Sequence, residues 1–438
     1  MRALVLEEGN YSAALSAVRA LGRLGHEVAV AAPFETPASS SRWCGRVLVS
    51  PAPRDAASYA DFLARTVGEA TYDIAFVCDD AIIEIVSRTR AALPRRPDFL
   101  LPPRESLQIA RNKVSAQRFA AALGIPTPRT LPLESAEGLD AARGLGFPLV
   151  IKGDQGSGGT HVRYGTNPDE MRRAYDELTT ARHVGRPMAQ EFIPGDGYLT
   201  QVLYHHGQLV ALCSHRKVRQ FPVAGGVTAK GVTVDEPQLD AQAERIFSAL
   251  EWHGPAKADF KRDRRDGLFK LMELDPRLTT TLEIAEAAGV NMIERCCLMA
   301  VGGRVEPRLE YRKGVAVRYL YRDLLCLATR PALLPRLLAD AIDPRVRSDF
   351  DWRDLPGDRG LVRRGFWHFE SAWRGGQLRP ERGTLPRPGS RGSRLRRKLD
   401  RLAPALIGGS LLAGRALYRG LRLLRGRGVR RVRRGAET

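Results

Sequence analysis

The chain has 438 residues, too many for one ordinary domain, and this length predicts two to four structural units. Hydrophobic residues make up 43% of it, and the formal net charge is +20. Residues 391–438 hold 15 Lys and Arg against two acids, so this tail carries +13 of that charge. The rest is only mildly basic, which excludes net charge as an argument for a specific nucleic-acid partner.

Cysteine usage and the apolar segments indicate a cytoplasmic protein. The six cysteines show no Cys-x-x-Cys spacing, which gives little support to a disulfide framework or a zinc site. Reduced thiols fit the cytoplasm better. The apolar run near the first residue is too short for a signal peptide, and no stretch reaches the roughly 18–20 apolar residues of a spanning helix.

The first hundred residues alternate between strand and helix patterns. Short apolar runs predict buried strands, and apolar residues at helical spacing predict the helices between them. The expected elements lie at 2–6, 13–24, 27–32, 56–68 and 73–78, with a helix after Asp80 and a short strand at 99–101. This order predicts a Rossmann-like domain over residues 1–105 of an α/β protein. No Gly-x-Gly-x-x-Gly follows the first strand, which argues against a dinucleotide site.

After two consecutive prolines at 102–103 the pattern changes. A helix is predicted over 106–123, where Ser106 is the cap and Gly124 the stop. Further expected elements are the helices 135–144 and 238–250, and the strands 147–152, 188–193, 198–204, 208–215, 256–261 and 269–274. We expect a two-lobed α+β domain over 106–307, with lobes at 106–187 and 188–307.

The C-terminal third carries less information. Residues 308–385 predict a mainly helical extension, with one helix near 324–341, and nothing in them indicates chemistry. Residues 386–438 are rich in Pro, Gly and Arg. One interpretation is a disordered basic tail. The other is an amphipathic segment, within 391–438, that lies on the anionic inner face of the membrane.

A glycine-rich run follows a predicted buried strand that ends in Lys152. Gly156, Ser157, Gly158 and Gly159 form its centre. Glycines let backbone N–H groups approach phosphate oxygens closely, and the lysine can add positive charge to the same phosphates. The lysine precedes the glycines, so this is not a Walker A loop. The alternative is an ordinary surface turn.

Three acids are expected to converge on one face of a hairpin. Glu273 and Asp275 lie two residues apart on a predicted strand, and Asp259 lies on the partner strand. Three such carboxylates repel one another unless a cation lies among them, and magnesium prefers oxygen ligands. Arg277 follows on the same side and could contact a phosphoryl group. The alternative is a solvated acidic edge that pairs with Arg277.

Other candidates are weaker when taken singly. Lys113 lies on a predicted helix, where most lysines are simply solvated. A strand that enters a turn could hold an adenine and a ribose, through Gln190, Glu191, Phe192, Ile193 and Asp196. Arg216 belongs to a basic run at 215–221 that would suit a carboxylate or acyl phosphate, or else a solvated strand edge.

Together these motifs resemble the ATP-grasp superfamily. The resemblance rests on Asn112-Lys113, on residues 124–128, 147–159 and 190–197, and on the run from Met272 to Arg277. It is nearest to the single-unit branch that is similar to carbamoyl phosphate synthase and to predicted carboligases, which are carboxylate–amine ligases. It covers roughly residues 1–305, and four motifs in the right order make it specific.

The resemblance implies a role for each motif. Lys113 and Lys152 match the two lysines that contact the ATP phosphates, and the loop at 156–159 matches the one that closes over them. Residues 190–193 match the adenine-binding hinge, and Arg277 the phosphate-binding arginine. Asp259, Glu273 and Asp275 match the ligands of Mg²⁺ (or Mn²⁺). Members of the family most often have Asn at the position of Asp275, and Asp196 only approximates the place of the ribose-binding acid.

The reaction implied by the resemblance is phosphorylation of a small-molecule carboxylate by ATP, followed by attack of an amine on the acyl phosphate. A carbamoyl-phosphate-synthase-like enzyme is one alternative, and an ATP-binding module without catalysis is another. A biotin carboxylase is less favoured, because no carrier-lysine motif such as Met-Lys-Met is present. The two substrates stay open, and so does the oligomeric state, for which a homodimer is one arrangement.

Overall fold

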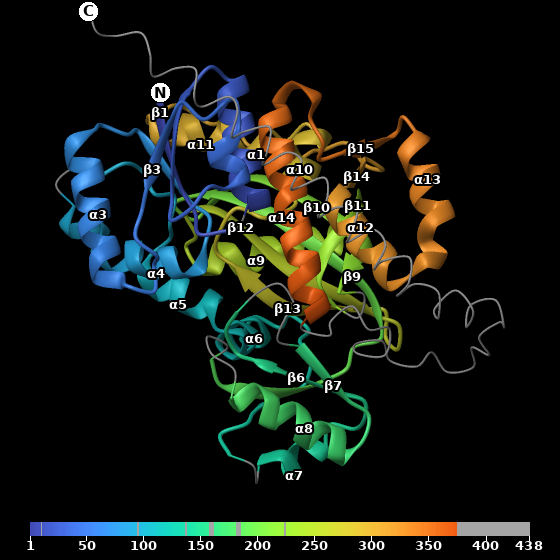
Figure 1. The fold of residues 1–438 in the computed structure, drawn as a ribbon. Helices are drawn as coiled ribbons and strands as arrows, with labels where there is room; N and C mark the ends of the chain where they lie inside the picture. Colours follow the sequence, from blue (N-terminus) through green and yellow to red (C-terminus); the bar gives the residue numbers. More distant parts are fainter. Residues whose placement is uncertain are drawn as a thin grey trace, which may run out of the picture.

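The computed structural model describes residues 1–9, 11–93, 96–135, 138–156, 162–180, 185–222 and 225–374. It is an α/β protein with three sheets, of four, seven and four strands. Figure 1 shows the N-terminal domain and the C-terminal helices at one end of the large sheet, and a small lobe at the other. The tail at 386–438, and with it the membrane hypothesis, lies outside the described residues.

The N-terminal domain confirms the predicted strand–helix–strand order. Its four parallel strands follow the order β3-β2-β1-β4. They are β1 (Arg2–Leu6), β2 (Glu27–Ala32), β3 (Arg46–Val49) and β4 (Ile74–Val77), connected by α1 (Tyr11–Arg23), α2 (Pro37–Ser40), α3 (Ala56–Glu69), α4 (Asp80–Thr89) and the 3₁₀ turn η1 (Arg90–Ala92). The strand expected at 99–101 does not form. Only Asp98 bridges to Ile74, because Leu100 has a φ of 49° that extended backbone does not allow.

The single helix expected at 106–123 is in fact two helices, α5 (Arg104–Arg111) and α6 (Lys113–Ala122). Asn112 separates them in an extended conformation, and its side-chain oxygen accepts from the backbone N–H of Ser115. Asn competes in this way with helical hydrogen bonds and therefore favours a cap. The break makes Lys113 the first residue of a helix.

The small lobe has its own antiparallel sheet and core. Its strands follow the order β5-β8-β6-β7, and its helices α7 and α8 pack on one face. The elements are β5 (Thr130–Pro132), α7 (Gly138–Arg143), β6 (Leu149–Gly153), β7 (Val162–Gly165), α8 (Pro168–Thr179) and β8 (Pro187–Glu191). The sheet of this lobe therefore extends to Glu191.

The large sheet has the order β13-β12-β9-β10-β11-β14-β15. The predicted antiparallel strands at 198–215 and the hairpin at 256–274 are confirmed within it. Its strands are β9 (Gly195–His205), β10 (Gln208–Phe221), β11 (Val227–Thr233), β12 (Gly254–Asp263), β13 (Phe269–Asp275), β14 (Ala316–Arg318) and β15 (Val346–Ser348), accompanied by α9 (Pro237–Ala249), α10 (Leu282–Ala288) and α11 (Met292–Ala300).

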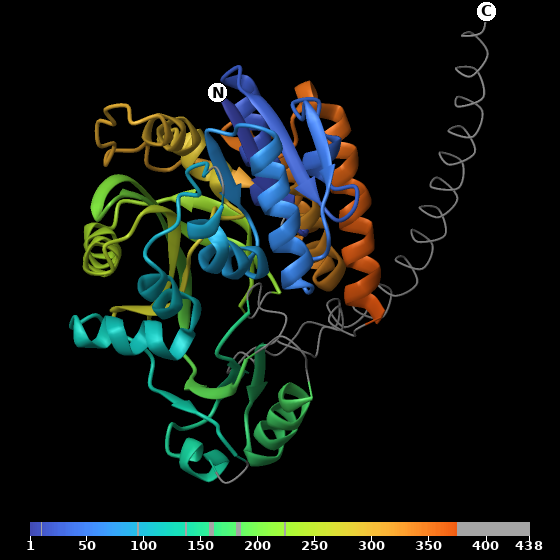
Figure 2. The same ribbon diagram turned by 90° about the vertical axis from the view of Figure 1, so that its left-hand side faces the viewer.

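The C-terminal segment adds helices and also the last two strands of the large sheet, β14 and β15, of which β15 lies at the edge. The helix expected at 324–341 is divided into α12 (Leu320–Thr329), the turn η2 (Pro331–Leu333) and α13 (Leu334–Ile342). Pro331 has no N–H to donate and disfavours helical geometry at Arg330, so the helix ends there. After the turn η3 (Trp352–Asp354), α14 (Leu355–Arg374) lies beside the N-terminal domain, as Figures 1 and 2 show.

Buried ion pairs hold α14 and the turn before it against the first helix. The Arg19 guanidinium in α1 contacts Asp354 at 2.8 Å and Asp358 at 2.7 Å, and all three side chains are at most 5% exposed. The end of the described chain is thereby tied to its beginning. None of the described helices combines the length and apolarity required to cross a membrane.

Candidate functional site

The three predicted acids do converge. β12 and β13 are antiparallel neighbours, and their register places Asp259 opposite Glu273 and Lys257 opposite Asp275. Asp259 and Asp275 are each 5% exposed, whereas the Glu273 side chain keeps 26% of its surface open. Two buried carboxylates and one partly open carboxylate therefore face one point toward the open end of the hairpin, away from its turn.

Lys257 lies among these acids, and sequence reasoning missed it. Its Nζ donates a short hydrogen bond to Asp259 and lies 3.7 Å from Glu273 and 3.4 Å from Asp275. Lys217 on β10 contacts Asp259 from the other side. The period of two in β12, where Lys257, Asp259 and Lys261 alternate with buried Ala256, Ala258 and Phe260, is a signal that could have found it.

These contacts determine the charge state of the acids. Burial by itself would raise the pKa of Asp259, but Lys217 and Lys257 outweigh burial and hold that pKa well below its usual range. Burial raises the pKa of Asp275 to about 6, against the opposing effect of Arg277 and Lys257. In return the acids raise the pKa of Lys257 above its usual value despite burial.

The same residues fit a magnesium ion. Carboxylate oxygens are the donors that Mg²⁺ takes in proteins, usually one or two of them together with substrate phosphates. Asp275 Oδ1 is buried and has no hydrogen-bond partner among the described residues, so one lone pair is left for a cation. Glu273 and Asp275 are the best-placed ligands, and Asp259 is the acid most fully neutralised by lysine.

The two predicted phosphate lysines lie on the small-lobe side of the acids. Lys113 Nζ is 3.7 Å from Glu273 and donates to the carbonyl of Gly156 at 2.5 Å. Lys152 is 7% exposed, and burial together with the nearby charge of Lys113 lowers its pKa to about 8. Gly156 has a φ of 89° at the entry to the loop, and Ser157, Gly158 and Gly159 lie outside the described residues. The structure thus brings both lysines to the acids.

One backbone and one side-chain hydrogen bond fix the start of α6 against the end of β6. The backbone N–H of Lys113 donates to the carbonyl of Asp154 at 2.9 Å, and the side-chain amide of Asn112 donates to the Asp154 carboxylate at 2.8 Å. These bonds place Lys113 at the entrance to the glycine loop, at the N-terminus of a helix, where anions are favoured.

The segment predicted to hold adenine joins the sheet of the small lobe to the large sheet. Gln190 is fully buried and donates to Thr130 at 2.9 Å, but its own carbonyl oxygen has no partner among the described residues. Glu191 pairs with Arg129 and Arg265, each at 3.4 Å, so its carboxylate is held by protein. The other two predicted residues contact Lys261.

Lys261 was not among the predicted residues. Its Nζ donates to the carbonyl of Ile193 at 2.6 Å and lies 4.9 Å from the centre of the Phe192 ring. Burial and neighbouring Lys217 lower its pKa to about 8. Like Lys257, it lies on the charged face of β12.

Arg277 connects the acids to the N-terminal domain. It is 6% exposed and contacts Asp275 at 3.0 Å and Asp80 at 3.3 Å. Asp80 begins α4, directly beyond the carboxyl end of the parallel strand β4, where ligands of open α/β sheets commonly bind. The N-terminal domain therefore supplies a residue that holds Arg277, and Asp80 was not predicted.

Arg216 and Asp196 face one another rather than the acids. Their closest atoms are 3.4 Å apart, and the side chains are 46% and 58% exposed. Successive residues of a strand point to opposite sides, so Lys217, the neighbour of Arg216, is the residue that reaches Asp259. The basic run therefore contributes Lys217 to the acids.

Comparisons with known proteins show a family match and several distant relatives. Residues 185–322 match the family described as ATP-grasp in the biosynthetic pathway with Ter operon. The putative urea carboxylase of Emericella nidulans is 24% identical over 60% of this chain and 22% of its own length. The N-terminal section of the carbamoyl phosphate synthase large chain of Methanopyrus kandleri is 22% identical over 46% of this chain and 38% of its own. The chain thus spans only a minor part of these relatives.

Solved structures show the same fold. The biotin carboxylase domain of Hydrogenobacter thermophilus 2-oxoglutarate carboxylase, a dimer in complex with MgADP and bicarbonate, superposes with a TM-score of 0.61 and 17% identity, over 72% of this chain and 73% of that one. An L-amino acid ligase from Bacillus licheniformis gives 0.54 and 18%, over 70% and 77%. The acids, the paired lysines and these likenesses lead to one conclusion: the chain contains an ATP-grasp domain, has sequence relatives among carbamoyl phosphate synthases and carboxylases, and shares its fold with an L-amino acid ligase.

Proposed function

We propose that this chain is an ADP-forming ligase, dependent on ATP and on Mg²⁺ or Mn²⁺, that activates a small-molecule carboxylate as an acyl phosphate and joins it to an amine. One observation carries the proposal. Three carboxylates on β12 and β13 meet Lys113 of α6 at Glu273 and lie near Lys152 of the small lobe, and Asp275 keeps an unpartnered oxygen beside Arg277. This is a set of groups suited to a metal-bound triphosphate.

The reaction requires no nucleophile from the protein. An oxygen of the substrate carboxylate attacks the terminal phosphorus of ATP, and the bond to ADP breaks. The amine then attacks the acyl carbon, releases inorganic phosphate and loses a proton. Glu273 and Asp275 would hold magnesium, which would neutralise negative charge on the phosphates. Lys113, Lys152 and Arg277 would supply the remaining positive charge, so catalysis is positioning and electrostatic stabilisation.

The nucleoside would lie against the segment that joins the two sheets. Gln190 and Glu191 end β8 there and Phe192 and Ile193 follow it, and the unpartnered carbonyl of Gln190 could accept from an exocyclic amine. Glu191 is already held by arginines, so it would support the segment, and Asp196 is the candidate acceptor for the ribose. For the substrate carboxylate, Lys217 is the better-placed member of the basic run, and Arg216 lies further out.

A release assay tests the proposal. The chain, with Mg²⁺ and ATP, is supplied with pools of carboxylic acids and amines, and ADP is measured. We expect release that requires one member of each pool and is lost in Lys152→Met and Glu273→Gln. Lys313→Met and Glu306→Gln are matched controls on exposed residues away from the site. Full activity in Lys152→Met and Glu273→Gln would show that the site is elsewhere, and ATP binding without turnover on any pool would favour a non-catalytic module.

A second candidate is activation of bicarbonate. Carboxylases and carbamoyl phosphate synthases recur among the relatives, and one structural neighbour carries bicarbonate beside MgADP. Bicarbonate is a small carboxylate-like anion that the same lysines could hold. ADP release that needs bicarbonate and no organic acid would favour this candidate over the first.

A further inference from the structure

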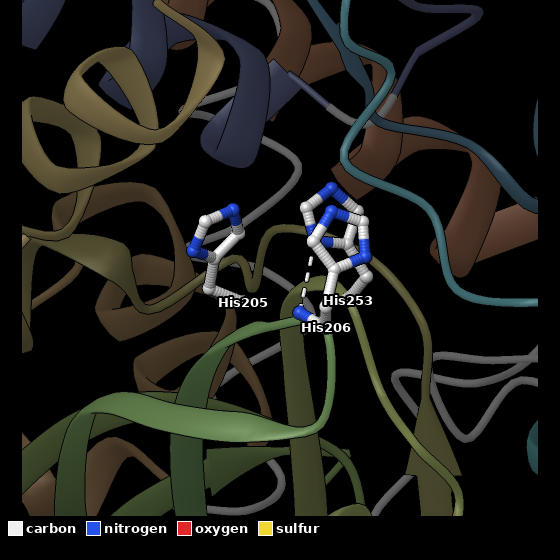
Figure 3. A group of neighbouring side chains, drawn as sticks. All are labelled: His205, His206 and His253. Atoms are coloured by element: carbon white, nitrogen blue, oxygen red, sulfur yellow. Dashed lines mark hydrogen bonds between the residues drawn. The ribbon is translucent and has the colours of Figure 1, made fainter. Parts of the chain in front are cut away.

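Three histidines meet at the far end of the large sheet from the acids. His205 ends β9, His206 and Gly207 form the turn to β10, and His253 directly precedes β12. His253 lies six residues before Asp259, which corresponds to about 20 Å along an extended strand. Figure 3 shows the three side chains together, with His206 and His253 stacked and His205 to one side.

The turn conformation is what allows two consecutive histidines to share one side of the strand. His206 has a φ of 46° and Gly207 a φ of 81°, as a two-residue hairpin turn requires. The ring centres of His206 and His253 are 4.1 Å apart and nearly parallel, and the His205 ring is 4.9 Å from His206 and 5.7 Å from His253. One nitrogen of each ring lies within 4.8 Å of those of the other two.

Asp98 orients the buried member of this group. Its Oδ1 lies 3.4 Å from Nε2 of His253, which is only 7% exposed. The backbone N–H of His206 points to the other nitrogen, Nδ1, at 3.4 Å. A ring that donates from Nε2 to a carboxylate keeps its lone pair on Nδ1. That lone pair accepts the His206 N–H in this structure, so a metal ion at Nδ1 would replace this hydrogen bond. A carboxylate behind a histidine in this way is the usual support of a metal ligand.

We propose that His205, His206 and His253 form a binding site for one divalent transition-metal ion of the zinc type, which Asp98 supports through His253. Imidazole nitrogens are favoured ligands of such ions, and three of them leave a further position for water. The site is separate from the acids and takes a different class of metal, because magnesium prefers oxygen.

Closing the group on an ion requires side-chain rotation. Tetrahedral zinc sites with bonds of about 2.0–2.1 Å hold their nitrogens about 3.4 Å apart, and the nearly parallel rings of His206 and His253 must open from their stack before both can point to one ion. His206 is exposed and free to turn.

A metal ion here would clamp the N-terminal domain to the large sheet. The chain at Gly254 passes so close to the N-terminal domain that a Cβ on Gly254 would lie 1.8 Å from the carbonyl oxygen of Leu100. Asp98 belongs to that same segment, whereas the three ligands belong to the sheet. Bound metal therefore stabilises the contact between the two parts as well as the hairpin itself.

Cobalt titration of the full chain tests the proposal. Co²⁺ in a nitrogen-rich site of low coordination number absorbs visible light strongly, whereas Co²⁺ among oxygens absorbs weakly. Saturating Mg²⁺ is included to occupy the acids. We expect one equivalent of Co²⁺ to produce a strong visible band, and Zn²⁺ to displace it.

The matched variants are His206→Asn and His26→Asn. Asn tolerates the left-handed conformation of residue 206, and that side chain is exposed, so the fold should be retained. His26 lies in the N-terminal domain, outside the group. We expect His206→Asn to weaken Co²⁺ binding by roughly 10-fold or more and to lose the band, while His26→Asn behaves as the unmodified chain. Equal binding by both variants, or the absence of a strong band in the unmodified chain, would overturn the proposal.

Discussion

Nζ of Lys257 lies 3.4 Å from Oδ2 of Asp275, the residue that the β12–β13 register places directly opposite it. The same ammonium contacts Asp259 and Glu273, so one buried positive charge serves all three acids. An ammonium and a divalent cation at this point compete for the same oxygens. Lys257 would thus stabilise the chain before metal binds, at the cost of weaker metal binding.

Lys257→Met separates these two effects. Without the ammonium, buried carboxylates lose their partner, and breaking a buried pair costs about 3–5 kcal/mol. We expect the free energy of unfolding to fall by about this amount in EDTA and to recover largely with Mg²⁺, which would bind more tightly than in the unmodified chain. Urea unfolding with and without Mg²⁺ measures both. Lys257→Arg is the charge-retaining control, and an equal loss of stability in EDTA and in Mg²⁺ would argue against competition.

The lowered pKa of Lys152 predicts that the protein takes up a proton when it binds nucleotide. Its pKa of about 8 means that the free protein loses this proton above pH 8, whereas bound phosphates favour the ammonium form. At pH 9 we expect binding of a non-hydrolysable ATP analogue to take up protons, and affinity to fall with rising pH. Titration calorimetry in buffers of different ionisation enthalpy measures the uptake.

The pKa of Lys261 is also about 8, so this lysine could take up a proton as well. The deciding quantity is therefore the difference in proton uptake between the unmodified chain and Lys152→Met. On binding the analogue at pH 9, Lys152→Met should bind fewer protons than the unmodified chain, by at most one. At pH 6.5 the two proteins should bind the same number. If the two proteins take up equal numbers at pH 9, Lys152 does not contact the phosphates.

Asp80 is predicted to position Arg277. The contact at 3.3 Å comes from the N-terminal domain, and small misplacements of a catalytic group can cost up to about 100-fold in rate. We expect Asp80→Asn to lower kcat by about tenfold with little change in the KM for ATP. Glu84→Gln removes another acid of the same helix, paired with Arg111, and should leave kcat unchanged. A matching loss in both variants would indicate general damage to the helix.

The buried ion pairs of Arg19 with Asp354 and Asp358 are predicted to stabilise the folded protein. Arg19→Met leaves Asp354 and Asp358 buried without their partner, and we expect a loss of about 3–5 kcal/mol in the free energy of unfolding. Arg23, one turn along α1, makes a half-exposed pair with Asp351. Arg23→Met should therefore cost less than about 1 kcal/mol. Similar losses in the two variants, measured by urea unfolding, would contradict the difference in burial.

The acids could be predicted from sequence because strand periodicity is local. Glu273 and Asp275 share a face by their spacing alone, and a short charged turn brings Asp259 opposite them. Lys257 obeys the same periodicity, but a lysine on a strand suggests solvent until its acidic surroundings are known. The acids on this face of the hairpin could therefore be predicted, whereas the presence of Lys257 among them could not.

Other features depend on contacts that sequence does not display. The break at Asn112 arises from a cap and a bond to Asp154, 42 residues away. Asp80 meets Arg277 across 197 positions, and His253 meets the turn at His206 across 47. No local pattern marks such pairs, because each residue alone is typical of a solvated surface.

The most direct test of the proposed function follows oxygen from substrate to product. Acids labelled with ¹⁸O in the carboxylate are supplied with ATP, Mg²⁺ and the active amine pool, and the inorganic phosphate is analysed by mass spectrometry. Because the carboxylate oxygen attacks phosphorus and stays with it, the account predicts one ¹⁸O atom in each phosphate released. Phosphate without label, formed while the labelled acid is consumed, would contradict an acyl phosphate.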